Sequence, residues 1–88
     1  MPTISAFHGI TIHMWWREHP PPHFHVRYAG HAASVSINQL DLVDGWLPPR
    51  ILRLVKEWAF AHRDELTDNW RRACAVPPQP LKPIDPLP

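Results

Sequence analysis

The sequence has little of what disulfide-stabilised or membrane-bound proteins require. Its 88 residues include a single cysteine, which excludes an internal disulfide and fits a reducing compartment. No apolar run approaches the roughly 18 residues of a membrane span. The N-terminal residues lack the basic and apolar segments of a signal peptide. We therefore expect a cytoplasmic protein without a membrane partner.

Charge of one sign is also scarce. The formal net charge is +1 with neutral histidines, which is too small to indicate nucleic-acid binding through bulk electrostatics. The seven histidines modify this conclusion, because their unperturbed pKa of ~6.5 means that modest acidification would add positive charge.

Proline, by contrast, is abundant: the chain has 12, more than twice the usual share of about 5%. A hydrophobic content of 44% and five tryptophans argue against disorder. The length allows one small domain. Because six of the prolines fall after residue 76, we expect a single domain over 1–76. A Pro-rich extended tail over 77–88 should follow, without packing on the domain.

Alternating apolar and polar residues predict an antiparallel β-meander of four to five strands. The predicted strands are 3–7, 10–16, 23–29 and 32–37, with a short edge strand at 40–43. In the second strand we expect Met14 and Trp16 on the inner face. Phe24 and Val26 should face the same way in the third.

One long helix is expected from residue 50 to about 75. Pro48 and Pro49 suit a helix start, and Pro77 disfavours helix at the residue before it. An apolar stripe with helical spacing runs through the segment. The predicted fold class is α+β, a small antiparallel meander with this C-terminal helix packed on one face.

The outward strand faces carry a polar group of residues. If the second and third strands pair with Met14 opposite Val26, then Trp15 lies opposite His25 and His13 opposite Arg27. The resulting patch contains His13, Trp15, His23, His25 and Arg27.

Two chemistries suit this patch. His23 and His25 could act as general acid and general base in RNA cleavage without a metal. Arg27 would then hold the phosphate, and Trp15 would stack a base. Alternatively, the His-x-His spacing suits a divalent transition metal, with His13 as the best third ligand. No metal is favoured, because no Cys pair or His-Glu-x-x-His motif supports one. A plain solvated strand face is the remaining interpretation.

The predicted helix carries two polar residues near its apolar stripe, His62 and Asn69. Polar groups directed at a core need hydrogen-bond partners, so a structural role is the simpler interpretation. In the functional interpretation they line a nucleic-acid or partner surface together with His13 and Trp15.

Several motifs together resemble the bacterial domain-of-unknown-function family 4160. The resemblance extends over about residues 1–75 and centres on Pro21-Pro22-His23-Phe24-His25-Val26. The other matching positions are Met1-Pro2-Thr3-Ile4, Gly9-Ile10, Gly30, Gly45-x-Leu47-Pro48, Trp58, His62-Arg63, Leu66 and Asn69-Trp70. The family's hallmark polar positions correspond to His23, His25, His62 and Asn69, whereas Arg27 stands at a variable position.

The resemblance implies a small bacterial protein encoded beside another small protein, in an arrangement like that of toxin–antitoxin pairs. We therefore expect a toxin–antitoxin-type component that acts on or binds RNA and that, if catalytic, is a metal-independent ribonuclease. The alternatives are a non-enzymatic module that binds the neighbouring gene's product, and a metal-binding protein. The expected partners are RNA, that cognate small protein and a second copy of the chain.

Overall fold

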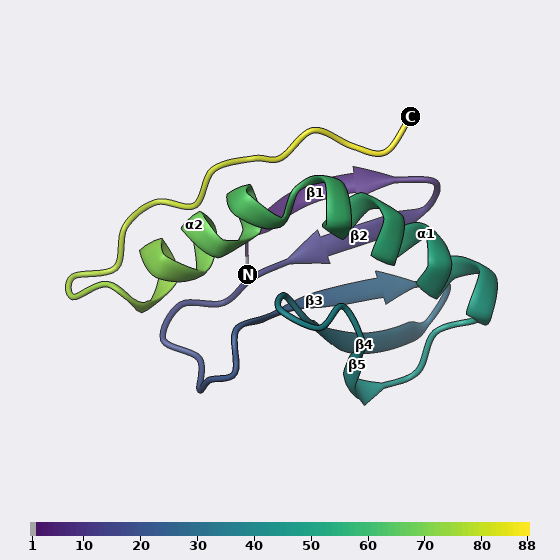
Figure 1. Cartoon of the computed structure of the whole chain (residues 1–88), viewed down its shortest axis with the longest axis horizontal. Helices are drawn as coiled ribbons and strands as arrows, with labels where there is room; N and C mark the ends of the chain where they lie inside the picture. The colour runs from purple at the N-terminus through teal and green to yellow at the C-terminus, as the bar shows by residue number, and fades with distance from the viewer. Residues whose placement is uncertain (1) are drawn as a thin grey trace.

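The computed structural model describes residues 2–88, so Met1, the first residue of the predicted domain, lies outside it. Five antiparallel strands follow one another in chain order across one sheet (Figure 1). They are β1 (Thr3–Phe7), β2 (Ile10–His13), β3 (His23–Tyr28), β4 (His31–Ser36) and β5 (Leu42–Gly45). Two helices, α1 (Pro49–Ala61) and α2 (Arg63–Cys74), lie against one face of the sheet. The predicted α+β meander is confirmed.

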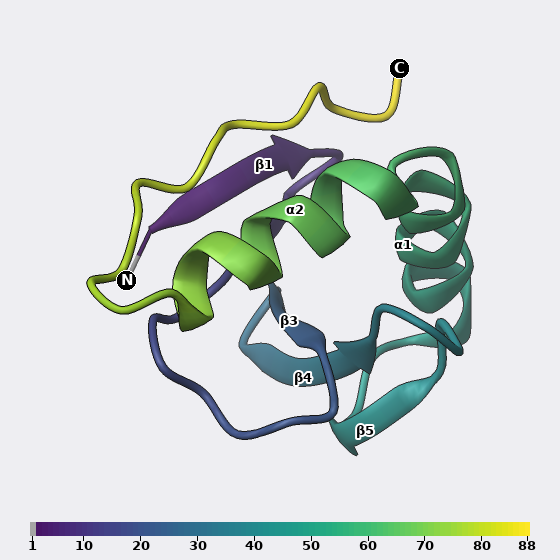
Figure 2. The same ribbon diagram turned by 60° about the vertical axis from the view of Figure 1, so that its left-hand side comes forward.

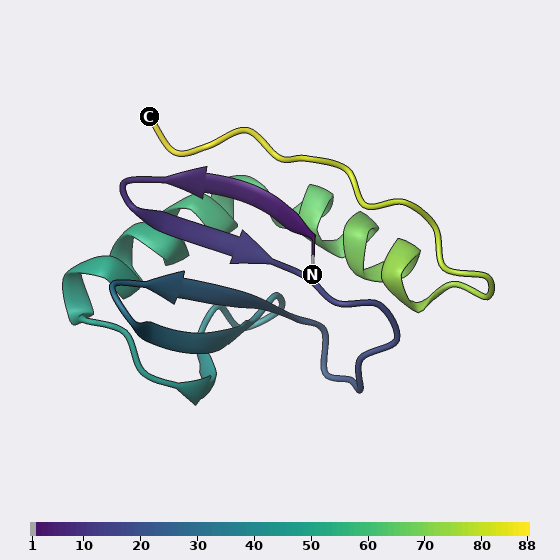
Figure 3. The ribbon, with the colours of Figure 1, turned by 180° about the vertical axis from the view of Figure 1, so that it is seen from behind.

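The hydrophobic core lies between the sheet and the two helices. Inward side chains of β2, β3 and β4 meet those of the helices, and Trp58 of α1 is fully buried at their centre. Its ring lies 5.4 Å from the ring of Phe7 and 5.9 Å from that of Phe24. The opposite face of the sheet carries no helix (Figure 3). That open face is where the polar strand residues point.

The prediction of one long helix is wrong, because the helix breaks at His62. This residue has φ −119° and ψ 24°, and its N–H is shared between the carbonyls of Trp58 and Ala59. A straight helix of 26 residues would be about 39 Å long and would overhang strands of about 20 Å. The break turns α2 back over the sheet (Figure 2). Leu66 and Ala73 of α2 are thereby buried like Val55 of α1.

The Pro-rich tail is extended, as expected, but it packs on the domain, contrary to expectation. It runs back along α2 and β1, and its Ile84 is buried with 4% exposure (Figure 1). The Ile84 N–H donates to the carbonyl of Ile4 at 2.8 Å. Extended Pro-rich chain has three residues per turn, so Leu81, Ile84 and Leu87 share one side. That side faces the core.

The register between β2 and β3 differs from the prediction by two residues. His13 lies opposite His25, and Thr11 lies opposite Arg27. The predicted faces survive because a shift of two residues preserves side-chain orientation. The strand ends at His13 because the chain then leaves the sheet towards α2. Trp16, expected inside, is 45% exposed.

Candidate functional site

A row of polar side chains crosses the open face of the sheet. Each strand contributes one residue to this row, and each residue is the cross-strand partner of the next, from edge strand β1 to edge strand β5. The row is Thr3, His13, His25, Ser34 and Asp44. No helix among residues 2–88 covers this face, which Figure 3 presents to the viewer.

His13 is committed to this row by hydrogen bonds on both ring nitrogens. Its Nδ1 lies 3.2 Å from the hydroxyl oxygen of Thr3, and its Nε2 lies 2.9 Å from that of Thr11. Burial lowers the pKa of His13, and the nearby charges of Arg27 and His25 lower it further. His13 is therefore a neutral structural residue here, with no free nitrogen for a metal ion.

The structure brings one carboxylate and two imidazoles together in a cluster. Glu18, in the loop between β2 and β3, contacts both His23 and His25. Its Oε2 lies 3.3 Å from Nε2 of His23, and its Oε1 contacts Nε2 of His25. One ligand atom from each of the three residues lies within 4.8 Å of the others, and all three residues are partly buried.

The outer nitrogens of the two imidazoles are also fixed. Nδ1 of His23 lies 2.7 Å from the carbonyl oxygen of Pro21, so this nitrogen donates and must carry a hydrogen. Nδ1 of His25 is hydrogen-bonded to the hydroxyl of Ser34 at 3.2 Å. Both rings therefore turn Nε2 towards Glu18. The neutral His23 ring would present a lone pair to a carboxylate oxygen, so a positive charge between them, either a proton or a metal ion, would stabilise this arrangement.

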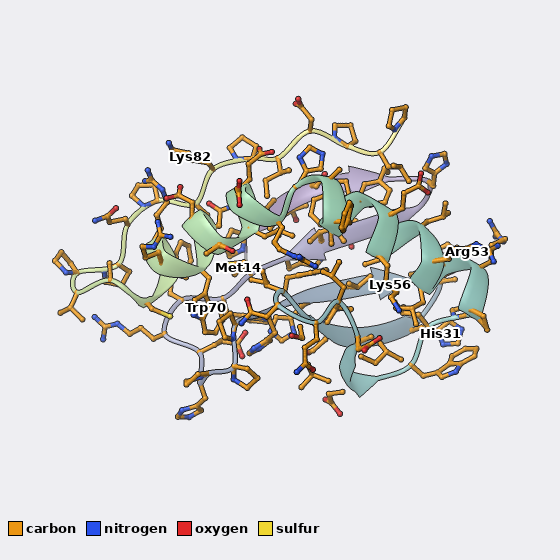
Figure 4. The ribbon with its side chains drawn as sticks, viewed as in Figure 1. Met14, His31, Arg53, Lys56, Trp70 and Lys82 are labelled. Carbon is orange, nitrogen blue, oxygen red and sulfur yellow. The ribbon has the colours of Figure 1, made fainter. Side chains whose placement is uncertain are left out.

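Two tryptophans enclose the imidazoles. The ring centroid of Trp70, on α2, lies 5.2 Å from that of His23, and that of Trp15 lies 5.4 Å from that of His25. Figure 4 labels Trp70 among the side chains. The ring of Trp15 meets His25 edge-on, and it keeps 38% of its surface exposed. The pair of rings is therefore held from both sides.

The loop that carries Glu18 is anchored to α2 and to the tail. The N–H of Arg17 donates to the carbonyl of Ala73 at 3.0 Å, and Nε1 of Trp16 donates to that of Gln79 at 3.3 Å. At the other end of the loop, the N–H of Ile37 donates to the carbonyl of Pro22. The C-terminal third of the chain thus helps to position Glu18.

Most predicted site residues lie on the open face, but only some lie together. His23, His25 and Trp15 form one group, while Arg27 is exposed further along β3. His62 and Asn69 belong to the helical layer and have structural partners. His62 Nδ1 lies 2.6 Å from Glu65 Oε1, and the Asn69 amide binds the backbone of Lys82.

Glu18 is a site residue that no pattern in the sequence predicts. It belongs to an irregular loop, so no periodicity marks it. One signal was present: Glu18 is the only acidic residue before Asp41, and it precedes the two histidines by five and seven positions. That spacing allows a loop to fold back over a strand.

Hollows in the open face extend from this cluster along β3. One of about 160 Å³ lies beside His25 and is lined by Trp15, Arg27, Ser34 and Asp44, among others. A second, of about 300 Å³, lies on the other side of Arg27 near Tyr28 and His31. Arg27 borders both hollows and forms no ion pair within residues 2–88.

The fold and site define a small α+β domain with a His₂–Glu cluster on an open sheet face. The chain belongs to the family described as Domain of unknown function (DUF4160), which matches residues 9–71 and confirms the resemblance. The matched segment includes all three residues of the cluster. Neither the curated proteins nor the solved structures contain a match. No helix within residues 2–88 is long and apolar enough to cross a membrane.

Proposed function

We propose that this protein binds a divalent transition-metal ion through Glu18, His23 and His25. The observation that carries the proposal is the convergence of three ligand atoms within 4.8 Å, with the outer nitrogens of both imidazoles already bonded. Metal-bound histidines typically donate or share their second nitrogen in this way. His23 and His25 are also the ligands expected from the sequence, whereas Glu18 takes the place expected for His13.

The spacing of Glu18 and His23 suits a transition metal, whereas the direct contact of Glu18 Oε1 with Nε2 of His25 has to open to admit an ion. Two ligands at about 2.05 Å from a tetrahedral ion lie about 3.3 Å apart. The separation between Glu18 Oε2 and His23 Nε2 is 3.3 Å. Two histidines and one carboxylate are the ligand set of catalytic zinc sites and of non-haem iron sites. Such sites leave at least one coordination position open for water or a substrate, where the ion supplies a Lewis acid.

Metal uptake by the purified full-length chain tests the proposal. After removal of metal with a chelator, the protein is titrated with Zn²⁺ and with Co²⁺. We expect one ion per chain, and d–d bands of Co²⁺ that report nitrogen and oxygen ligands. The variants Glu18→Gln and His25→Ala should weaken binding by more than tenfold. His19→Ala is the control, because His19 lies in the same loop and is exposed.

A substoichiometric ion content, or equal losses in His19→Ala and His25→Ala, would refute the metal site. Tryptophan fluorescence offers a second readout, since Trp15 and Trp70 contact the two ligand imidazoles. Thermal unfolding without metal separates a lost ligand from a lost fold.

A second candidate function is action on or binding of RNA, as one member of a bacterial toxin–antitoxin-type pair in the cytoplasm. The favouring observation is that Trp15 and Arg27 are exposed on the open face beside His25. A metal-independent acid–base pair is less well supported, because Glu18 engages both histidines at once. Growth on induced expression tests this candidate: His23→Ala plus His25→Ala should relieve any slowing, and His8→Ala plus His19→Ala should not.

If the protein is a non-enzymatic module that binds the neighbouring gene's product, its binding surface cannot be the tail. Because the tail is bonded to its own domain, a neighbouring gene's product would have to bind elsewhere. Co-purification with that product, before and after mutation of exposed Phe60 on α1, tests whether the outer helix face is used.

A further inference from the structure

We infer that the open face binds a single-stranded phosphodiester, with its phosphate on Arg27 and one of its arms directed at the Glu18–His23–His25 cluster. The inference deepens the second candidate function by naming the ligand class and the residue that holds it, and it rests on the first candidate only for the metal at one end of the groove. The groove is our name for the two hollows that both have Arg27 and Ala32 in their lining.

Arg27 is suited to hold an oxyanion. It is exposed on β3, and its neighbours across the sheet are the small residues Thr11 and Ala32. No carboxylate within residues 2–88 pairs with it. A guanidinium without a protein partner presents a planar fork of donors that matches phosphate oxygens.

The form of the groove selects the kind of anion. Because Arg27 borders a hollow on each side, an anion that carries a substituent on each side would fill both hollows. A phosphodiester carries a substituent on each side of its phosphate, whereas a phosphomonoester or a carboxylate carries a substituent on one side only. Asp44 lines the hollow beside His25, so a group with two negative charges would be repelled more than a diester with one.

The two ends of the groove offer aromatic surfaces. Trp15 lines the hollow beside His25 at one end, and Tyr28 and His31 line the hollow at the other end. Unpaired bases stack on such rings without strict sequence preference. A paired duplex would hide its bases, so a single strand is the form that fits.

The test is binding of fluorescein-labelled hexauridylate to the full-length, Zn²⁺-titrated chain, followed by anisotropy. Arg27→Ala should weaken binding at least tenfold, and Arg27→Lys should weaken it less. Arg53→Ala is the matched control, since Arg53 is an exposed arginine on α1 (Figure 4). With one phosphate contact, log K should fall with log salt concentration at a slope of about −0.7.

Competition experiments distinguish a free dinucleotide from a segment of an RNA strand as the ligand. Unlabelled diuridylate should compete, whereas inorganic phosphate at the same concentration should not. If diuridylate competes as well as hexauridylate, the groove takes free dinucleotides; if hexauridylate is stronger, it takes a segment of an RNA strand. Equal competition by inorganic phosphate, or equal losses in Arg27→Ala and Arg53→Ala, overturns the inference.

Metal content measured on the same samples separates this inference from the proposed function. A chain that binds hexauridylate through Arg27 but takes up no metal keeps the groove and refutes the metal site. A chain that takes up one Zn²⁺ but ignores hexauridylate and diuridylate keeps the metal site and refutes the groove. Arg27→Ala should leave the metal content unchanged.

Discussion

Asn69 of α2 holds Lys82 of the tail through two hydrogen bonds of opposite direction. Its amide nitrogen donates to the Lys82 carbonyl at 2.9 Å, and its amide oxygen accepts from the Lys82 N–H at 2.8 Å. An asparagine side chain thus takes the place of a neighbouring strand. This pairing explains why a polar residue with 1% exposure is tolerated on the apolar stripe of α2.

The first prediction concerns this pairing. Asn69→Ala removes both hydrogen bonds from a buried position, so the free energy of unfolding should fall by about 1–3 kcal/mol. Urea denaturation measures the change. Asn38→Ala, at an exposed turn position, should remain within about 0.5 kcal/mol of the parent protein. Equal stability of the two variants would mean that the tail is not held by Asn69.

The second prediction concerns the apolar contact of the tail. Ile84 is buried among core residues, so Ile84→Ala should cost about 2–4 kcal/mol of unfolding free energy. Val76→Ala removes a side chain that is 88% exposed and should cost little. Thermal unfolding of both variants checks the contrast. A tail that contributes nothing would leave both unfolding temperatures unchanged.

The third prediction concerns the support of His25. Ser34→Ala removes the hydroxyl bonded to Nδ1 of His25, so metal affinity should fall about 10-fold or more while the three ligands remain. Ser36→Ala is the matched control, because Ser36 lies on the same strand and its hydroxyl accepts from the Gln39 N–H instead. Zn²⁺ titration of both variants measures the difference. Similar affinities would show that Ser34 does not orient His25.

The fourth prediction concerns pH. Burial lowers the pKa of His13 below its ordinary value of 6.5, and Arg27 and His25 lower it further, whereas its hydrogen-bond partners Thr3 and Thr11 are uncharged. Below about pH 6.5 the unfolded chain therefore binds a proton that the folded chain does not. The unfolding free energy should fall as the pH decreases from there towards the lowered pKa.

His13→Gln should flatten this part of the pH dependence. Urea denaturation between pH 7.5 and 5, with a chelator present, excludes any contribution from a bound ion. Identical slopes for the two proteins would contradict a buried neutral His13.

Local patterns predicted most of the fold, because alternation and helical spacing are properties of neighbouring residues. The strands, their inward faces and the position of His23 and His25 on one face follow from those patterns. The register of β2 against β3 does not, since the exit of the chain after His13 depends on α2, some 60 residues away. Glu18 was missed for the same reason: its place over β3 is set by bonds from Arg17 and Trp16 to Ala73 and Gln79.

The helix break and the packed tail illustrate a second limit. The spacing of Leu81, Ile84 and Leu87 was visible in the sequence, but it gains meaning only when an apolar surface lies within reach. The break at His62 creates that surface by turning α2 across the sheet beside β1. One local departure from helical geometry therefore determines where the last twelve residues lie.

The tail also affects whether the sheets of two copies of the chain can associate edge to edge. A five-stranded meander has two edge strands, and open edges are sites of edge-to-edge aggregation. Along β1 the tail lies beside the edge and donates one backbone hydrogen bond, from Ile84 to Ile4, and its prolines have no N–H to pair with a further strand. The other edge strand is β5, where exposed Asp44 opposes pairing with the same edge of a second copy.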